Sequence, residues 1–282
     1  MIFILADDLG WMDVSVYGSD LYETPAIDSL AQTAVRFTNA YAASPLCSPT
    51  RASILTGQEV GRLRLIKPLV YGQMEPVLLN PRETDHAREI AKATVPQSRN
   101  RLPNTYVTFA EVLKEHGYAT AFMGKWHLGA DPYIPENQGF DYVVGGREDP
   151  GPPPPGHYFA PWSLDTLPNV QDGTHISDVL TDSAIQFVKN NQTRPFLLCL
   201  WYYDVHTPLQ AKGALDVFKH TEMGTRKRGI VCCATRSAVA SLQYSDKTGR
   251  TGFKAANSSV QRCWSGRNKK CAALVERWSP AS

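Results

Sequence analysis

Short apolar runs of strand length alternate with runs of helical periodicity over residues 1–211, and this alternation limits the folds open to the chain. Ile2–Ala6 is an unbroken apolar run, typical of a strand in a parallel sheet. Ile27, Leu30 and Ala31 follow it on one face of a helix, at i, i+3 and i+4. Strands that alternate with helices imply βαβ units. We therefore expect an α/β fold with a mostly parallel sheet flanked by helices.

Capping residues set the ends of the expected helices. Thr24-Pro25 is typical of an N-cap and a first helical residue, and Thr108 with Glu111 forms a capping box. Two strands and one amphipathic helix are expected farther along, at Tyr118–Met123, Pro195–Tyr203 and around Leu180, Ala184, Phe187 and Val188. The remaining stretches lack a period: we expect an irregular insertion at 58–104 and a proline-rich surface connector at Arg147–Gly156.

Composition excludes a disordered or fibrous chain, because 43% of the residues are hydrophobic and 20% are charged. No apolar run reaches the roughly 20 residues that cross a bilayer, so no membrane span is expected. Met1 leads directly into apolar residues without a basic segment or a cleavage site, and the sequence as written carries no secretory signal.

Charge divides the chain at residue 211. Residues 1–211 hold 15 Lys and Arg against 23 Asp and Glu, a net charge of −8, whereas 212–282 hold 14 against 4, a net charge of +10. Four of the six cysteines also lie in 212–282, where no period is sustained. We predict a first segment at 1–211 and an irregular basic tail of different origin at 212–282.

Three origins of the tail fit its composition. It is a basic module for a polyanion, a disulfide-rich appendage, or the product of a frameshift or a mis-joined exon. The cysteines lack the paired spacing of zinc ligands. Loss of periodicity, the charge change and the cysteine excess begin at one place, which favours the frameshift. We therefore expect no nucleic-acid partner.

Two adjacent carboxylates, Asp7 and Asp8, follow the first expected strand. Ligands of open parallel sheets gather beyond the carboxyl ends of the strands. Hard oxygen ligands in that position suit Ca²⁺ or Mg²⁺. The alternative is an acidic turn or a helix cap without a metal.

Cys47 begins the run Cys-Ser-Pro-Thr-Arg, which continues to Leu-Thr-Gly at residue 57. Pro49 is typical of a first helical turn, so Cys47 is expected near a helix N-terminus. The helix dipole and Arg51, one turn on, would favour an anionic group there. The alternative is a small buried cysteine ahead of an ordinary helix.

The Cys-x-Pro-x-Arg motif at Cys47 resembles the signature of the type I, formylglycine-dependent sulfatases, and the sequence is arylsulfatase-like. Three other motifs follow the order of that family: the acidic pair at Asp7, Gly-Lys-Trp-His-Leu-Gly from Gly124, and His-Thr-Pro from His206. The resemblance covers residues 1–211 and implies the N-terminal part of a sulfatase catalytic domain. It also implies the alkaline-phosphatase-like sulfatase fold, truncated in this chain.

The resemblance implies a site chemistry as well. In the family the cysteine is converted to formylglycine, whose hydrate attacks sulfur with one hydroxyl and expels sulfate through the other. Asp7, Asp8 and the converted Cys47 would be Ca²⁺ ligands. By the same resemblance, Arg51 would stabilise the formylglycine and Lys125 would bind the sulfate oxygens. His127 would hydrogen-bond the formylglycine, and His206 would protonate the departing alcohol. The other five histidines are expected at the surface.

The implied partners are a sulfated small molecule or sulfated glycan and a formylglycine-generating maturation enzyme. Family members usually work in the periplasm, in the lysosome or outside the cell. The sequence departs from the family in lacking a later Asp-Asn metal pair and a later sulfate-binding Lys. Two alternatives therefore stand beside the sulfatase: a phosphate or phosphonate ester hydrolase on the same scaffold, and an inactive remnant.

Overall fold

A single mixed sheet organises the computed structural model, which describes residues 1–20, 22–70, 96–210, 212 and 273–276. The strand order is β3-β2-β4-β1-β5. β1 to β4 run parallel, and β5 pairs antiparallel with β1. The expectation of a mostly parallel sheet is confirmed. The strands are β1 (Ile2–Leu5), β2 (Ala119–Gly124), β3 (Tyr142–Gly145), β4 (Phe196–Trp201) and β5 (Ala273–Glu276).

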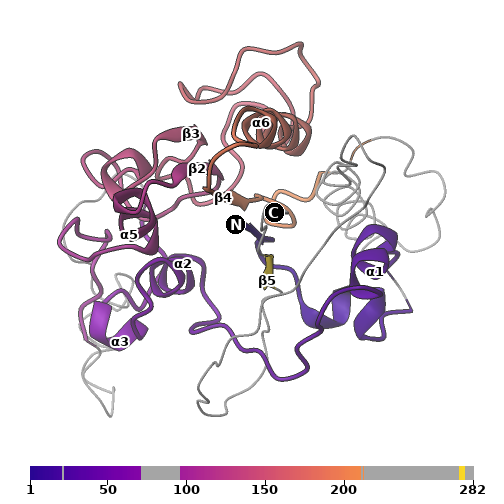
Figure 1. The fold of residues 1–282 in the computed structure, drawn as a ribbon, viewed down its shortest axis with the longest axis horizontal. Helices are drawn as coiled ribbons and strands as arrows, with labels where there is room; N and C mark the ends of the chain where they lie inside the picture. The colour runs from indigo at the N-terminus through magenta and orange to yellow at the C-terminus, as the bar shows by residue number, and fades with distance from the viewer. Residues whose placement is uncertain (21, 71–95, 211, 213–272, 277–282) are drawn as a thin grey trace, which may run out of the picture.

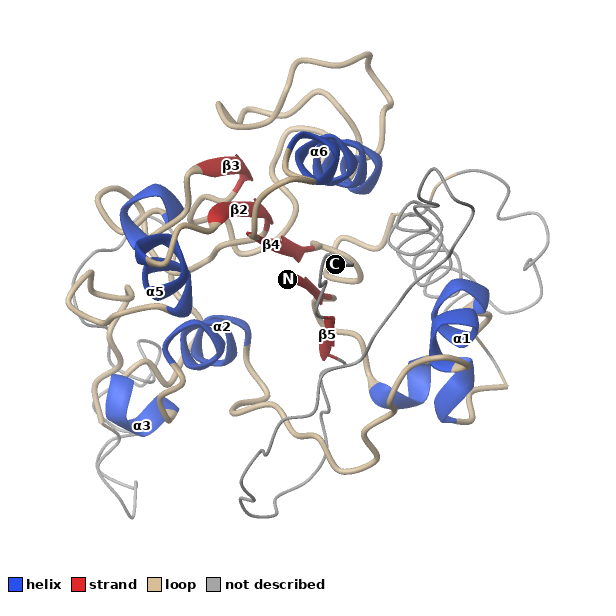
Figure 2. Ribbon diagram, in the orientation of Figure 1, coloured by secondary structure: helices blue, strands red, loops and turns tan. Residues whose placement is uncertain are grey.

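Helices cover both faces of this sheet (Figure 1). In Figure 2, α6 lies on one face, and α2 and α5 lie on the other. The described α-helices are α1 (Pro25–Ala31), α2 (Cys47–Thr56), α3 (Val60–Leu63), α5 (Phe109–Glu115) and α6 (Ile176–Asn190). Three 3₁₀ helices complete the described elements, at Trp11–Asp13 (η1), Ser15–Tyr17 (η2) and Pro135–Gln138 (η3).

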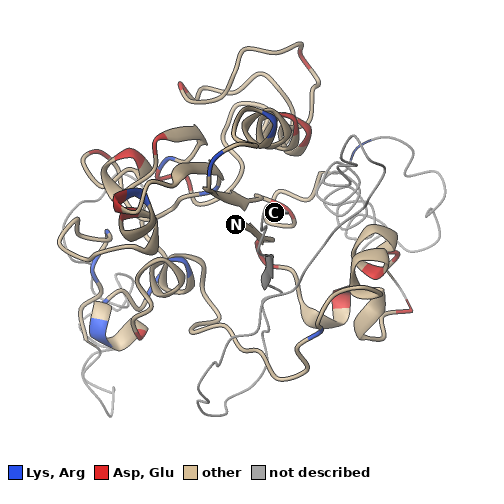
Figure 3. Ribbon diagram, in the orientation of Figure 1, with Lys and Arg blue, Asp and Glu red and all other residues tan. Residues whose placement is uncertain are grey.

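The two faces of the sheet carry separate hydrophobic cores, because alternate side chains of a strand point to opposite sides. On β4, Leu198 and Leu200 belong to the core that includes Leu180 of α6. Cys199 and Trp201 belong to the core under α2 and α5. Strands β1 to β4 hold no charged residue, and charges lie on helices and loops instead (Figure 3). This pattern explains the unbroken apolar runs in the sequence.

The predicted starts of two helices are confirmed. Thr108 and Glu111 form the expected capping box at the start of α5. Pro25 is the first residue of α1, with Thr24 as its N-cap. No helix in the described ranges has the length and apolar character needed to cross a membrane.

Two loop predictions were wrong in part. Residues 58–70 include the short helix α3, although 71–95 of the predicted insertion lie outside the described residues. The proline-rich connector is not confined to the surface, because Gly151, Pro152 and Pro153 are buried. Its first half packs into the protein, while Pro154 and Pro155 are exposed.

Most of the predicted tail lies outside the described residues, and its boundary and origin stay predictions. The described exceptions are Lys212, which pairs with Asp178, and β5, which adds a strand next to β1 where only an irregular segment was expected. Four residues are too few to show a period in the sequence. The expected surface histidines His86 and His220 also lie outside the described residues.

His175 was predicted at the surface, but it is buried and caps α6. Its Nδ1 accepts a hydrogen bond from the Ser177 amide at 3.3 Å. Burial, aided by Lys212, lowers the pKa of His175 to about 4, so the folded protein keeps this ring neutral.

The free energy of unfolding should therefore fall as the pH drops from about 6.5 to 4, because the unfolded chain takes up a proton that folded His175 refuses. A His175→Asn variant retains an N-cap acceptor without the titration. Its stability should fall less steeply over this range, by up to about 1.4 kcal/mol per pH unit. Urea unfolding at several pH values measures the difference, and parallel curves for the two proteins would contradict it.

Candidate functional site

The predicted site residues meet at the carboxyl end of the parallel strands. Asp7 follows β1, Lys125 and His127 follow β2, and His206 follows β4. Cys47 is the first residue of α2, as its proline predicted. These elements are far apart in the sequence, and the sheet brings their ends together at one edge.

A buried ion triad forms the floor of this site. Nη2 of Arg51 donates to Oδ1 of Asp7 at 3.0 Å, and Nζ of Lys125 donates to Oδ2. Nη1 of Arg51 also donates to the backbone carbonyl of Lys125. The guanidinium carbon Cζ of Arg51 lies 5.3 Å from the centroid of the Trp201 ring. Buried charges persist only when they are paired in this way.

The triad determines the protonation of Asp7. Burial alone would raise the pKa of this carboxyl, but Arg51 and Lys125 outweigh burial and hold the pKa at about 2. Asp7 is therefore ionised at neutral pH. The exposed fraction of Lys125 is 0%, so water does not reach its ammonium. The described ion-pair partner of this ammonium is Asp7. One carboxylate against two cations leaves the triad with a net charge of +1.

His127 is buried beside the triad in a defined tautomer. Its Nε2 lies 3.2 Å from the carbonyl oxygen of Leu69, which can only accept, so Nε2 carries the proton. Nδ1 is buried and has no hydrogen-bond partner among the described residues. Burial, with the nearby Lys125 charge, lowers the pKa of His127 to about 3. A neutral ring with a free Nδ1 lone pair can accept a proton.

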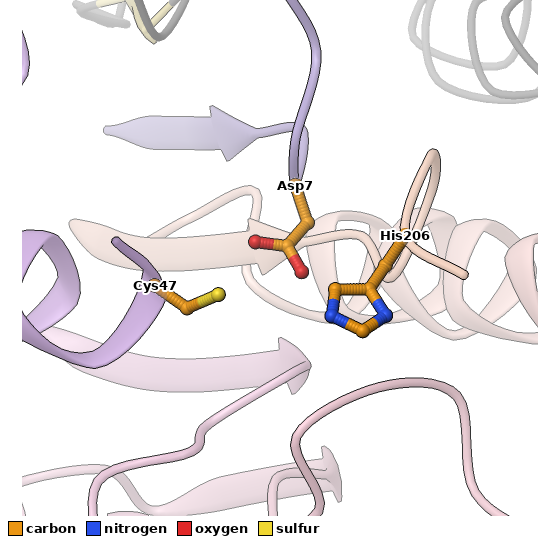
Figure 4. Close-up of side chains that lie close together, drawn as sticks. All are labelled: Asp7, Cys47 and His206. Atoms are coloured by element: carbon orange, nitrogen blue, oxygen red, sulfur yellow. The ribbon is translucent and has the colours of Figure 1, made fainter. Parts of the chain in front are cut away.

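His206 lies on the loop after β4, on the side of Asp7 opposite Cys47 (Figure 4). Its Nδ1 lies 2.7 Å from the Thr207 carbonyl oxygen, so Nδ1 donates and Nε2 is left with its lone pair. The buried start of the proline-rich loop contacts this ring. A Cβ on Gly151 would lie 2.8 Å from Nδ1 of His206, so only glycine fits without a shift.

Cys47 lines a cavity of about 200 Å³ together with Asp7, Asp8 and Arg51. Its side chain is half-buried. Burial raises the pKa of the Cys47 thiol, and Asp7 adds to the rise while Lys125 and Arg51 oppose it. Burial therefore opposes the anionic group that the helix N-terminus and Arg51 would favour at this position. Asp8 is exposed at the mouth of the same cavity.

The oxygen donors of this cavity are of the hard type that Ca²⁺ binds. A carboxylate offers about four lone-pair positions, and Arg51 and Lys125 occupy one each on Asp7. Asp8 lines the same cavity and offers a second carboxylate. An oxygen in place of Cys47 Sγ would add a third hard donor.

Three features of the site escaped the sequence analysis. Asp204 is fully buried after β4, its backbone oxygen accepts from the Asp7 amide at 2.7 Å, and burial raises its carboxyl pKa to about 6. The rule that identified Asp7, an acid after an apolar strand, also identifies Asp204. The Leu69 carbonyl and the Trp201 ring carry no such signal, because their contacts depend on the tertiary fold.

Comparison with known proteins identifies the family. A family model described as Sulfatase matches residues 1–248, which is past the predicted boundary at 211. N-acetylgalactosamine-6-sulfatase of Sus scrofa is 32% identical over 255 residues, covering 81% of this chain and 42% of that protein. Arylsulfatase A of Homo sapiens is 38% identical over 148 residues, covering 51% of this chain and 24% of that protein. The chain thus spans less than half the length of these relatives.

Solved structures agree with the family match. The crystal structure of Ps i-CgsB superposes with a TM-score of 0.65 at 27% identity, covering 86% of this chain and 54% of that one. BT4656, solved with its substrate D-glucosamine-2-N,6-O-disulfate, gives a TM-score of 0.52 at 26% identity, covering 75% of this chain and 35% of that one. The expected alkaline-phosphatase-like sulfatase fold is confirmed. The chain belongs to the sulfatase family.

Proposed function

We propose that this chain forms the formylglycine-bearing part of a sulfuric ester hydrolase that cleaves sulfate monoesters of sugars or aryl alcohols. The observation that carries the proposal is the meeting of Asp7, Cys47 and His206, whose ligand atoms lie within 4.8 Å of one another beside two buried cations. A sulfate ester brings one negative charge. That charge would balance the net +1 of the Asp7, Arg51 and Lys125 triad.

The site residues have distinct parts in this proposal. Lys125 stabilises negative charge on the sulfate oxygens and Arg51 stabilises the converted residue 47, since fixed positive charge in a buried site is worth more than in water. Neutral His127 accepts a proton at Nδ1 from the hydroxyl at position 47. Nε2 of His206, which carries a lone pair in the resting site, takes up a proton and passes it to the departing alcohol. Each histidine is oriented by a backbone carbonyl on its other nitrogen.

Two groups would supply chemistry that these side chains lack. A formylglycine made from Cys47 supplies, as a hydrate, one hydroxyl for attack and a second for release of sulfate. Ca²⁺ held by Asp7 and Asp8 would polarise the S–O bonds. A maturation enzyme is needed as a partner, because Cys47 must be converted before the site is complete.

Names of relatives favour a sulfated sugar as substrate. N-acetylgalactosamine-6-sulfatase is named for a sulfated amino sugar, and BT4656 was solved with a disulfated glucosamine. The sulfate half of such a substrate matches the net positive charge of the Asp7, Arg51 and Lys125 triad beside the cavity. The sugar half would be selected by residues outside the triad.

Co-expression of the chain with a formylglycine-generating enzyme tests the proposal. Mass spectrometry of the Cys47 peptide should show conversion of the thiol to the aldehyde. With Ca²⁺ present, the converted protein should hydrolyse an aryl sulfate faster than the matching aryl phosphate. Faster turnover of the phosphate would favour the phosphoesterase alternative, and a converted protein without turnover of either ester would favour the inactive remnant.

A further inference from the structure

Three potential metal ligands converge from separate segments of the chain. Figure 4 shows the Cys47 sulfur and one ring nitrogen of His206 on the sides facing the Asp7 carboxylate. Their ligand atoms all lie within 4.8 Å of one another. Ligand atoms of a tetrahedral zinc site lie roughly 3.5 Å apart, given metal–ligand distances of about 2.0 to 2.3 Å. Closure around an ion therefore requires an approach of at most about 1.3 Å between ligand atoms.

His206 is already arranged as a metal-binding histidine. Its Nδ1 donates to the Thr207 carbonyl at 2.7 Å, which leaves the Nε2 lone pair free to bind. Metal-binding histidines commonly make such a bond, because it fixes the tautomer and the ring orientation. Gly151 lies against the Nδ1 side of the ring, where a Cβ would come within 2.8 Å of Nδ1.

Asp7 retains capacity for a metal in spite of the ion triad. Arg51 and Lys125 each use one position on the carboxylate, and about two lone-pair positions remain. With Cys47 as a thiolate, the two anions balance the two cations before any metal binds. The exposed carboxylate of Asp8 adds negative charge at the cavity mouth.

The donor types select the metal. Ca²⁺ takes six to eight oxygen ligands, whereas a thiolate, an imidazole and one carboxylate suit Zn²⁺. We propose that the unconverted protein, with Cys47 as a free thiol, binds Zn²⁺ through Asp7, Cys47 and His206. The Cys47 S–H bond breaks, a Zn–S bond forms, the proton passes to solvent, and water completes the fourth position.

Conversion of Cys47 would then change the metal preference of the site. Replacing the soft sulfur by oxygen removes the ligand that most favours zinc and leaves hard donors that favour calcium. The zinc proposal concerns the thiol form alone. It stands or falls independently of sulfate ester hydrolysis.

Alkylation of Cys47, resolved by peptide mass spectrometry, tests the zinc site. The full chain is expressed without a maturation enzyme, and the thiol state of Cys47 is verified by mass. Stoichiometric Zn²⁺ should slow alkylation of the Cys47 peptide about tenfold or more, whereas the same concentration of Ca²⁺ should not. Because the readout is one peptide, zinc bound by the other cysteines does not obscure it.

Variants separate this site from general thiol protection. His206→Ala should remove most of the zinc protection, and His116→Ala, a change at an exposed histidine outside the cluster, should leave it intact. Since the described contacts of the His206 ring are to backbone, His206→Ala should stay folded, which thermal unfolding checks. Co²⁺ in place of Zn²⁺ should give a thiolate charge-transfer band that is weaker in Cys47→Ser by the part that Cys47 contributes. Equal alkylation rates with and without Zn²⁺, or protection that survives His206→Ala, would overturn the proposal.

Discussion

Replacing Asp7 by alanine is expected to lower the free energy of unfolding by about 3–5 kcal/mol, because two buried cations lose their common partner. The exposed fractions of Arg51 and Lys125 are 1% and 0%, so water cannot compensate them. The chain offers a matched control in Asp8, the adjacent and exposed carboxylate. Asp8→Ala should cost no more than about 1 kcal/mol, which is the preference of aspartate over alanine for the left-handed backbone at residue 8 (φ 57°). Urea unfolding followed by circular dichroism, with calcium chelated, measures both values.

A second substitution tests the cause. Lys125→Met in the Asp7→Ala background removes one of the unpaired cations, so the double variant should be more stable than Asp7→Ala alone. If Asp7→Ala does not fold, Asp7→Asn keeps the shape of the side chain and allows the same comparison. Equal losses for Asp7→Ala and Asp8→Ala would contradict the buried triad.

Acid should remove the same stabilisation. The pKa of folded Asp7 is about 2, below the unperturbed value of about 3.9 for an unfolded chain. The stabilising contribution is therefore present above about pH 4 and is lost as the pH falls through about 2. The Asp7→Ala variant should lack this part of the acid transition.

Features encoded by a few neighbouring residues could be predicted from the sequence. The capping box at Thr108 and the proline at the start of α1 were both confirmed, because a cap depends on contacts within one helical turn. The strands were equally accessible, since burial on both faces produces an unbroken apolar run, as at Phe196–Trp201.

Contacts between distant segments could not be predicted from periodicity. Lys125 and Asp7 are 118 residues apart, and their pairing depends on β1 and β2 lying in one sheet on either side of β4. His175 looks like an ordinary polar residue in a loop, yet it is buried as the cap of α6. The proline-rich loop likewise gave no sign that Gly151 would pack on His206.

The candidate site lies between these two cases. The rule that ligands collect beyond the carboxyl ends of parallel strands placed Asp7 at the site, and the helix start at Pro49 placed Cys47 at an N-terminus. The family motifs then named His206 and Lys125. The sequence could not reveal which of these residues touch, because the distances depend on how the loops after β2 and β4 fold over the sheet edge.

Replacing Cys47 by serine is expected to reduce steady-state aryl sulfate turnover of the matured protein by about 10³-fold or more, a loss typical of a removed nucleophile. Serine has one hydroxyl. Once that oxygen has attacked sulfur, no second hydroxyl remains to expel sulfate, so the variant should stop after one turnover. The expected product is a protein with one added SO₃ group at residue 47. Intact-mass and peptide mass spectrometry detect that group.

Three further variants test whether this trapped state depends on position 47 and on the surrounding charges. Cys47→Ala has no nucleophile and should show neither turnover nor added mass. Cys199→Ala changes the other described cysteine, which is buried in β4 and lies outside the cavity, so turnover per folded molecule should persist. In the serine variant, Lys125→Met should slow sulfation, because it removes one of the two buried positive charges that would offset the charge of the sulfate ester. A Cys47→Ser protein that keeps full turnover, or that stays unmodified while the parent turns over, would contradict the covalent mechanism.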